Sequence, residues 1–131
     1  MINYFSKYKF FFYLCNFILI ILYLFPGSIL GWYLYNDVSL QPQITPNLIA
    51  SSNHVYAFLI LSFVGFFTFK KIEQLKFLSI YLIFLSIILE ILHHFIPVRS
   101  FQFSDLFGNL VGVIIVIIIF YFFKKNENFK N

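Results

Sequence analysis

The sequence predicts an all-α fold: a polytopic membrane protein whose single domain, residues 1–131, is a bundle of four transmembrane helices. Hydrophobic residues make up 61% of the chain and charged residues 11%, whereas soluble chains are closer to half apolar and a quarter charged. The mean hydropathy is +0.88. The apolar residues fall in runs near the length of about 20 residues that crosses a bilayer, and short polar segments separate them.

The first apolar run predicts a helix over about residues 10–35. It is bulky and lacks a small-x-small cleavage site, so a membrane helix is favoured over a signal peptide. Pro26 lacks a backbone N–H, and we expect the helix to kink or end near it. Trp32 and Tyr33 follow at the position expected for an interfacial aromatic belt.

The rest of the chain predicts three more helices, at about residues 48–69, 77–96 and 105–123. Pro42 and Pro46 mark a loop before the second helix. Pro97 ends the third. Ser104 is a plausible N-cap for the fourth, with the anionic Asp105 favoured in its first turn.

The basic residues predict the orientation in the membrane. Of the nine, only Arg99 lies in the connection between the third and fourth predicted helices. The other eight lie at the amino terminus, between the second and third helices, or in the tail: Lys7, Lys9, Lys70, Lys71, Lys76, Lys124, Lys125 and Lys130. With four spans these places share one side, so the positive-inside rule predicts that both termini are cytoplasmic. The expected location is the bacterial cytoplasmic (inner) membrane, multi-pass. The expected partner is the lipid bilayer, not nucleic acid, and no oligomeric state is indicated.

A concentration of polar residues lies around the seam between the third and fourth predicted helices. Charged groups at membrane depth are costly and usually face a bundle interior or a functional cavity. The candidate binding residues are His54, Glu90, His93, Arg99, Asp105 and Asn109. Helical spacing places Glu90 and His93 on one face of the third helix, and Asp105 and Asn109 on one face of the fourth. We expect them to meet in one layer near the outer surface, with Arg99 folded back over it.

Three interpretations of this layer remain open. In a structural one, Arg99 pairs with Glu90 or Asp105, and the small residues of Gly108-x3-Gly112 allow close helix packing. In a binding one, Arg99 holds a phosphate or carboxylate of a lipid-linked intermediate. In a catalytic one, a membrane-embedded hydrolase or transferase uses Glu90 and His93 as acid and base, although no nucleophile motif is present. An enzyme is not the favoured interpretation.

A metal centre is the least favoured interpretation of the same residues. His54, His93, His94 and the two acids could supply enough nitrogen and oxygen donors for zinc or manganese. However, the adjacent histidines point about 100° apart on a helix, and no His-Glu-x-x-His pattern is present. The sequence therefore predicts no metal and no cofactor.

The spacing of these residues resembles a known signature. Glu-x2-His-x3-Pro-x-Arg followed by Asp-x3-Asn-x2-Gly is similar to the motif of the VanZ-like integral membrane proteins. It is formed here by Glu90, His93, Pro97, Arg99, Asp105, Asn109 and Gly112. Pro26-Gly27-Ser28 resembles the end of the family's first helix, and His54 the histidine that opens its second. The Asp-Lys pair that members often carry before this histidine is missing.

The resemblance implies a bacterial membrane protein of the cell envelope, related to proteins associated with resistance to the glycopeptide antibiotic teicoplanin. From it we expect a protein that engages a cell-wall or lipid intermediate at the outer face of the membrane. Antibiotic resistance itself need not follow for a small stand-alone chain.

Overall fold

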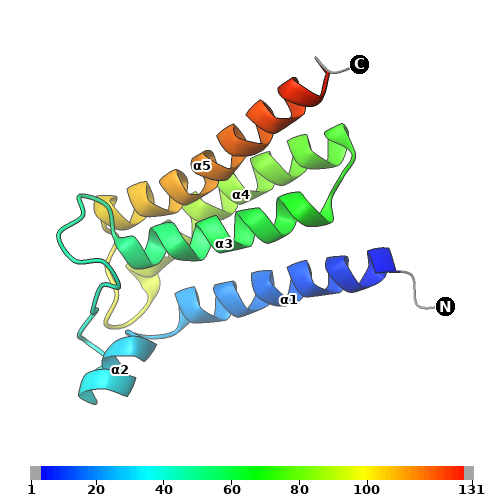
Figure 1. The fold of residues 1–131 in the computed structure, drawn as a ribbon. Coiled ribbons are helices and arrows are strands. Elements are labelled where there is room, and N and C mark those ends of the chain that lie inside the picture. Colours follow the sequence, from blue (N-terminus) through cyan, green and yellow to red (C-terminus); the bar gives the residue numbers. More distant parts are fainter. Residues whose placement is uncertain (1–3, 129–131) are drawn as a thin grey trace.

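The computed structural model describes residues 4–128, and the secondary structure of this part is entirely helical. The elements are α1 (Tyr4–Leu24), α2 (Ile29–Tyr35), α3 (Ser52–Thr68), α4 (Ile72–Leu92), a 3-10 turn (His93–Phe95) and α5 (Phe103–Asn128). Helices α1, α3, α4 and α5 lie side by side, whereas the short α2 turns away at one end (Figure 1). The start of α1 and the end of α5 are both at the opposite end of the bundle (Figure 1).

Three helices of the described chain are long and apolar enough to cross a membrane. Their apolar windows are Lys7–Leu24, Ile72–Phe95 and Phe103–Lys124. The fourth long element of the bundle, α3, is apolar but has 17 residues. At about 1.5 Å per residue it is roughly 26 Å long, slightly less than the ~30 Å hydrocarbon core of a typical bilayer. The predicted all-α class is confirmed, and three helices of the described chain have the length and apolar composition of membrane spans. The predicted count of four spanning helices is not confirmed, because α3 is shorter.

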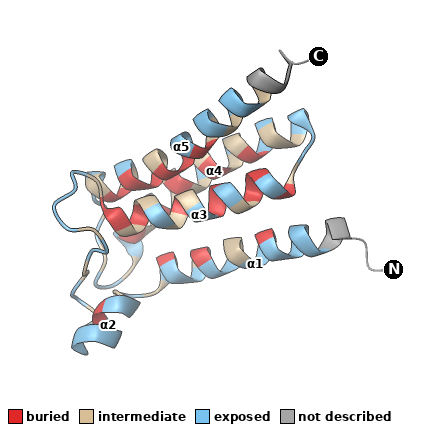
Figure 2. Cartoon of the chain, viewed as in Figure 1, coloured by how far each residue is buried: buried red, intermediate tan, exposed pale blue. Residues whose placement is uncertain are grey.

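Burial is concentrated where α3, α4 and α5 face one another, while much of α1 is exposed (Figure 2). The core includes Phe58, Leu82 and Val113. Large apolar side chains cover the outside of the bundle, for example Phe77 and Ile80 on α4. Such an exterior would be unfavourable in water but matches the hydrocarbon of a bilayer.

The predicted helix over residues 10–35 is two helices in the structure. The chain leaves the helical path after Leu24, and Gly27 adopts a left-handed φ of +106° beside Pro26. Ser28 then caps α2 by accepting a hydrogen bond from the Gly31 N–H at 3.0 Å. The break falls at the proline, where the missing N–H and the glycine together allow a sharp change of direction.

Other helix boundaries also differ from the predicted ones. Helix α4 begins at Ile72, not near residue 77, and its first turn contains Glu73, whose charge suits a helix N-terminus. Helix α5 begins at Phe103, so Ser104 lies inside its first turn and is not the N-cap. Helix α3 begins at Ser52, later than the predicted start near residue 48.

Two glycines of α5 set its distance from α3. A Cβ added to Gly108 would lie 2.7 Å from the backbone oxygen of Ser51, and one added to Gly112 would lie 2.5 Å from that of Val55. Only glycine permits this approach, as in other membrane helix pairs with small residues at this spacing. The predicted close packing at Gly108-x3-Gly112 is confirmed, and it brings the polar residues of α5 against α3.

Candidate functional site

A layer of buried polar side chains lies at the α2 end of the bundle. It contains one or more residues from each long helix, and we call it the polar layer: Tyr23, His54, Glu90, His93, Asp105 and Asn109. The side chains of Glu90 and Asn109 are fully buried, at 0% exposure. Sequence spacing predicted that the candidates from α3, α4 and α5 would meet at one level, and the structure brings five of the six predicted binding residues together there.

The centre of the layer is a hydrogen-bonded trio on three helices. The hydroxyl of Tyr23 on α1 donates to Oδ1 of Asn109 on α5, at 2.6 Å. Nδ1 of His54 on α3 lies 3.0 Å from the same oxygen and 3.1 Å from the Tyr23 hydroxyl. Asn109 also donates from Nδ2 to the backbone oxygen of Ser86 on α4. One amide therefore connects all four long helices.

The other nitrogen of His54 faces an acid. Nε2 of His54 lies 3.4 Å from Oδ2 of Asp105, and both residues are buried. The second carboxylate oxygen of Asp105 accepts a 3.3 Å hydrogen bond from the hydroxyl of Ser104. The ring of His54 is thus held by an amide on one side and faces a carboxylate on the other.

Glu90 and His93 form a second buried pair beside the first. Nδ1 of His93 lies 3.2 Å from Oε2 of Glu90. Nε2 of His93 lies 3.0 Å from the backbone oxygen of Tyr23 and must be the donor, because a carbonyl can only accept. The other carboxylate oxygen of Glu90 accepts a 2.9 Å hydrogen bond from the Gln102 N–H, just before α5.

Arg99 is not in the polar layer but at the end of α1. Its Nε donates to the backbone oxygen of Phe25 at 2.9 Å, and its Nη2 donates to those of Leu22 and Gly27 at 3.3 and 2.6 Å. Carbonyls at a helix C-terminus have no partner within the helix, and a cation there also suits the helix dipole. Among the described residues Arg99 forms no ion pair with Glu90.

Arg99 stays positively charged although its side chain is partly buried. Partial burial is the largest influence and lowers its pKa, while Tyr23, Asp105 and Glu90 oppose that shift. Arginine nevertheless remains protonated in proteins, so the cation persists beside the helix end. The guanidinium binds backbone carbonyls at the end of α1 instead of the carboxylate of Glu90 or Asp105.

A polar cavity of about 510 Å³ opens above the layer. Asp105 is the residue of the polar layer that lines it. Hydroxyl and amide side chains form most of the rest of its wall, among them Ser39, Gln41, Gln43, Thr45, Asn47, Ser51, Ser100, Gln102 and Ser104. Neither Glu90 nor His93 lines it. Access to the layer from this cavity therefore passes by Asp105.

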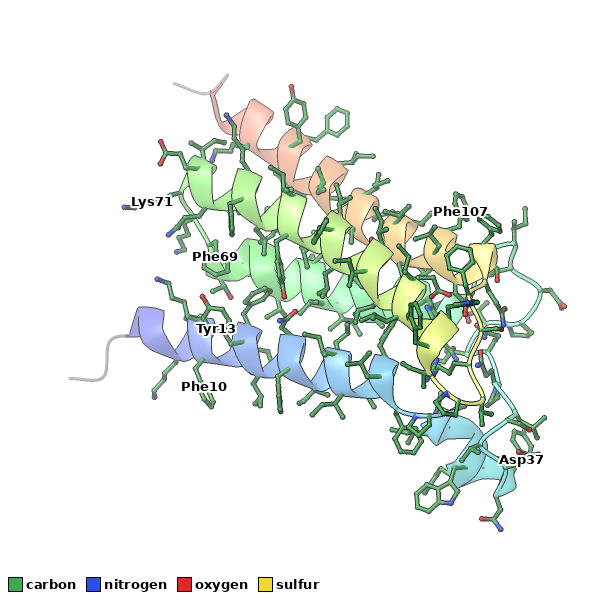
Figure 3. All side chains as sticks on the ribbon, turned by 180° about the vertical axis from the view of Figure 1, so that it is seen from behind. Phe10, Tyr13, Asp37, Phe69, Lys71 and Phe107 are labelled. Atoms are coloured by element: carbon green, nitrogen blue, oxygen red, sulfur yellow. The ribbon has the colours of Figure 1, made fainter. Side chains whose placement is uncertain are left out.

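A second cavity, of about 470 Å³, lies between α1 and α4 and is lined mainly by apolar residues such as Phe12 and Phe77. It shares no residue with the polar layer. It is near the end of the bundle that carries Lys71, whereas Asp37 and Phe107 lie at the opposite end (Figure 3). The polar layer and the polar cavity thus lie at the opposite end of the bundle from this apolar cavity.

Sequence reasoning missed Tyr23, and it named His94 only as a possible metal donor. Tyr23 is one of nine tyrosines, so composition gave it no prominence. Its position three residues before Pro26 was the usable signal, because a helix ending there puts the hydroxyl at the depth of the polar layer. His94 is exposed, as expected for one of two adjacent helical histidines.

Together the fold and site define an all-helical membrane protein with a buried polar layer beneath a polar cavity at one end of its bundle. Comparison with protein-family models, with curated proteins and with solved structures found no match to the chain.

Proposed function

We propose that this chain is a VanZ-like integral membrane protein of the bacterial cell envelope that binds the polar part of a cell-wall or lipid-linked intermediate at the outer face. The observation that carries the proposal is the polar cavity that ends at Asp105. It lies at the end of the bundle, where a lipid-linked molecule would present its head group.

The lining of the cavity suggests the chemistry of the bound group. Hydroxyl and amide side chains dominate it, and Asp105 is the one acidic or basic residue among its lining residues. Such a wall suits groups that donate and accept several hydrogen bonds, such as sugar hydroxyls or peptide amides. The phosphate clamp expected at Arg99 has less support, because three backbone carbonyls accept hydrogen bonds from this side chain.

The family assignment rests on the spacing of the motif and gains support from the role of its residues. Glu90, His93, Asp105 and Asn109 meet in the polar layer, and Gly112 allows the contact of α5 with α3. Each of these positions therefore has a physical reason to be restricted to its residue type. Glycopeptide resistance would be a consequence of binding envelope intermediates, not a separate activity.

Placement in the membrane is part of the same proposal. Helix α3 would be the fourth span, supported by its apolar sequence and its position beside α5. The lysines of the helix ends opposite α2, such as Lys71, favour a cytoplasmic location for that end. Reporter fusions after Asn131 and within residues 36–47 test this. A periplasmic tail or a cytoplasmic first loop would overturn both the orientation and the outer-face binding site.

The acid–base alternative has less support from the geometry. Glu90 and His93 lie 3.2 Å apart, but both are buried and neither lines the polar cavity. A general acid or base must reach its substrate directly or through one water. A purely structural role of the polar layer accounts for the hydrogen bonds around Asn109 but does not explain the polar cavity.

Native mass spectrometry of the purified full chain tests the binding proposal. Ser100 lines the cavity and is exposed, and no hydrogen bond of its side chain would be lost on substitution. Ser100→Trp should fill the cavity and abolish co-purification of a lipid-linked saccharide or peptide, whereas Ser100→Ala, which leaves the space open, should retain it. Wild-type protein without such a lipid, or equal retention in Ser100→Trp, would contradict the proposal.

A further inference from the structure

Three buried side chains of the polar layer come close enough to share one ion. His54, Glu90 and Asp105 lie on α3, α4 and α5, and one ligand atom from each lies within 4.8 Å of the others. The helices on which they lie are held together by the Gly108 and Gly112 contacts. The proximity therefore results from rigid elements of the fold.

The hydrogen bonds of His54 leave one nitrogen available as a ligand. Asn109 donates from Nδ2 to the Ser86 carbonyl, which fixes its Oδ1 as the atom facing His54. Because that oxygen can only accept, and the Tyr23 proton is also donated to it, Nδ1 of His54 carries its own hydrogen. In the neutral ring the lone pair is then on Nε2, which points toward Asp105 at 3.4 Å. This is the tautomer that binds metals through Nε2, with the other nitrogen oriented by a hydrogen bond.

Glu90 supplies an independent indication of a ligand. Its side chain is fully buried, and one oxygen is satisfied by the Gln102 N–H. The other, Oε2, has no hydrogen-bond partner in the described chain, since the nearby Nδ1 of His93 at 3.2 Å is not in hydrogen-bonding geometry. A buried carboxylate oxygen without a partner is costly. Such an atom is normally compensated by a cation or a proton.

We propose that His54 Nε2 and the carboxylates of Glu90 and Asp105 bind one divalent transition-metal ion of the Zn²⁺ or Mn²⁺ type. The donor set is one imidazole nitrogen with carboxylate oxygens, which suits these ions. Two carboxylates and a neutral imidazole balance a charge of +2, so the buried site becomes neutral. Asp105 also lines the polar cavity, which gives the ion a path from the outer side and leaves a coordination position toward it.

This site was not expected from the sequence, which contains no short metal motif. The ligands lie on three different helices, and only packing brings them together. The inference goes beyond the proposed binding of a head group and does not depend on it. It competes with one other explanation, in which protons shared among His54, His93, Asp105 and Glu90 neutralise the cluster.

Metal binding by the full chain in detergent distinguishes these explanations. After treatment with EDTA and dialysis, the protein is titrated separately with Zn²⁺ and Mn²⁺, and bound metal is measured by elemental mass spectrometry. We expect about one ion per chain for at least one of the two metals. His54→Gln and Asp105→Asn should each lower that affinity at least tenfold, by the general sensitivity of such sites. His94→Gln is the matched control, since His94 is exposed and outside the cluster, and it should bind as the wild type does.

A second measurement on the wild type covers variants that fail to fold. A ligand that binds the folded state raises its stability, so the bound metal should raise the unfolding midpoint while the same concentration of Mg²⁺ should not. Absence of both uptake and stabilisation in the wild type would overturn the proposal. So would wild-type affinity in folded His54→Gln, or an equal loss in His94→Gln. Metal uptake is measured here and lipid co-purification in the Ser100→Trp experiment, so failure of one proposal would be seen separately from failure of the other.

Discussion

The hydroxyl of Tyr23 donates a 2.6 Å hydrogen bond to Oδ1 of Asn109, joining the last turn of α1 to the first part of α5 inside the bundle. The same tyrosine accepts a hydrogen bond from His93 at its backbone oxygen, and its ring stacks on that of His93 at 5.6 Å. Helix α1 is the most exposed long helix of the bundle (Figure 2). The contacts of Tyr23 are therefore important for holding α1 against the other helices.

Tyr23→Phe should lower the free energy of unfolding by about 1 kcal/mol, the scale of hydrogen bonds between membrane helices. The ring remains, so packing and stacking are kept while the hydroxyl is lost. Reversible unfolding in mixed detergent micelles measures the change. Tyr33→Phe is the control. Tyr33 lies on α2 and is 79% exposed, so loss of its hydroxyl should have no measurable effect on stability. Equal stability of the two variants would show that the Tyr23 bond contributes nothing.

Arg99→Gln should lower the free energy of unfolding by about 1–2 kcal/mol, because carbonyls at the end of α1 would lose a charged donor. Partial exposure of the guanidinium keeps the expected value at the lower part of the range for such bonds. Arg99→Lys should recover part of the loss, since an ammonium can still approach one carbonyl. The same unfolding experiment measures both. A normally stable Arg99→Gln protein that loses a bound lipid would instead assign Arg99 to ligand binding.

Gly112→Ala should separate α3 from α5 and cost about 1–3 kcal/mol, the usual cost of overpacking. Its Cβ would meet backbone atoms, 2.5 Å from the Val55 oxygen and 2.8 Å from the Leu59 nitrogen, and these cannot move alone. Gly65→Ala is the matched control on α3, because its Cβ would meet only side-chain atoms of Leu78 and Phe12, which can rotate away. Thermal unfolding of the two variants should therefore differ, with Gly112→Ala the less stable.

Val98→Gly should stabilise the protein by about 1 kcal/mol. Val98 has a φ of +65°, which is strained for a β-branched residue, and Pro97 precedes it in a turn closed by the Arg99 N–H and the Ile96 oxygen at 3.2 Å. Glycine removes strain of about 1–3 kcal/mol, offset in part by its greater freedom in the unfolded chain. The side chain is 57% exposed, so little packing is lost. A lower unfolding midpoint for Val98→Gly would show that the turn is not strained.

The sequence predicted the level of the polar layer because helical spacing is local. Glu90 and His93 are one turn apart, as are Asp105 and Asn109, so each pair had to share a face of its helix. Pro26 marked the end of α1, whereas α4 ends at Leu92, earlier than predicted, and a 3-10 turn over His93–Phe95 continues toward Pro97. The all-helical membrane class followed from composition and from the lengths of the apolar runs. The resemblance to the VanZ-like family remains a prediction.

Tertiary structure alone decided which atoms meet within that layer. The partners of Arg99 are backbone carbonyls at and just beyond the end of α1, more than seventy positions earlier in the chain, and no local pattern marks them. The place of Tyr23 depends on how α1 rotates against α5. The convergence of His54, Glu90 and Asp105 depends on the distance between α3 and α5, which the backbone contacts at Gly108 and Gly112 set. Spacing along one helix fixes which side chains share a face, whereas the rotation and separation of helices come from packing, and packing determines the chemistry of the buried site.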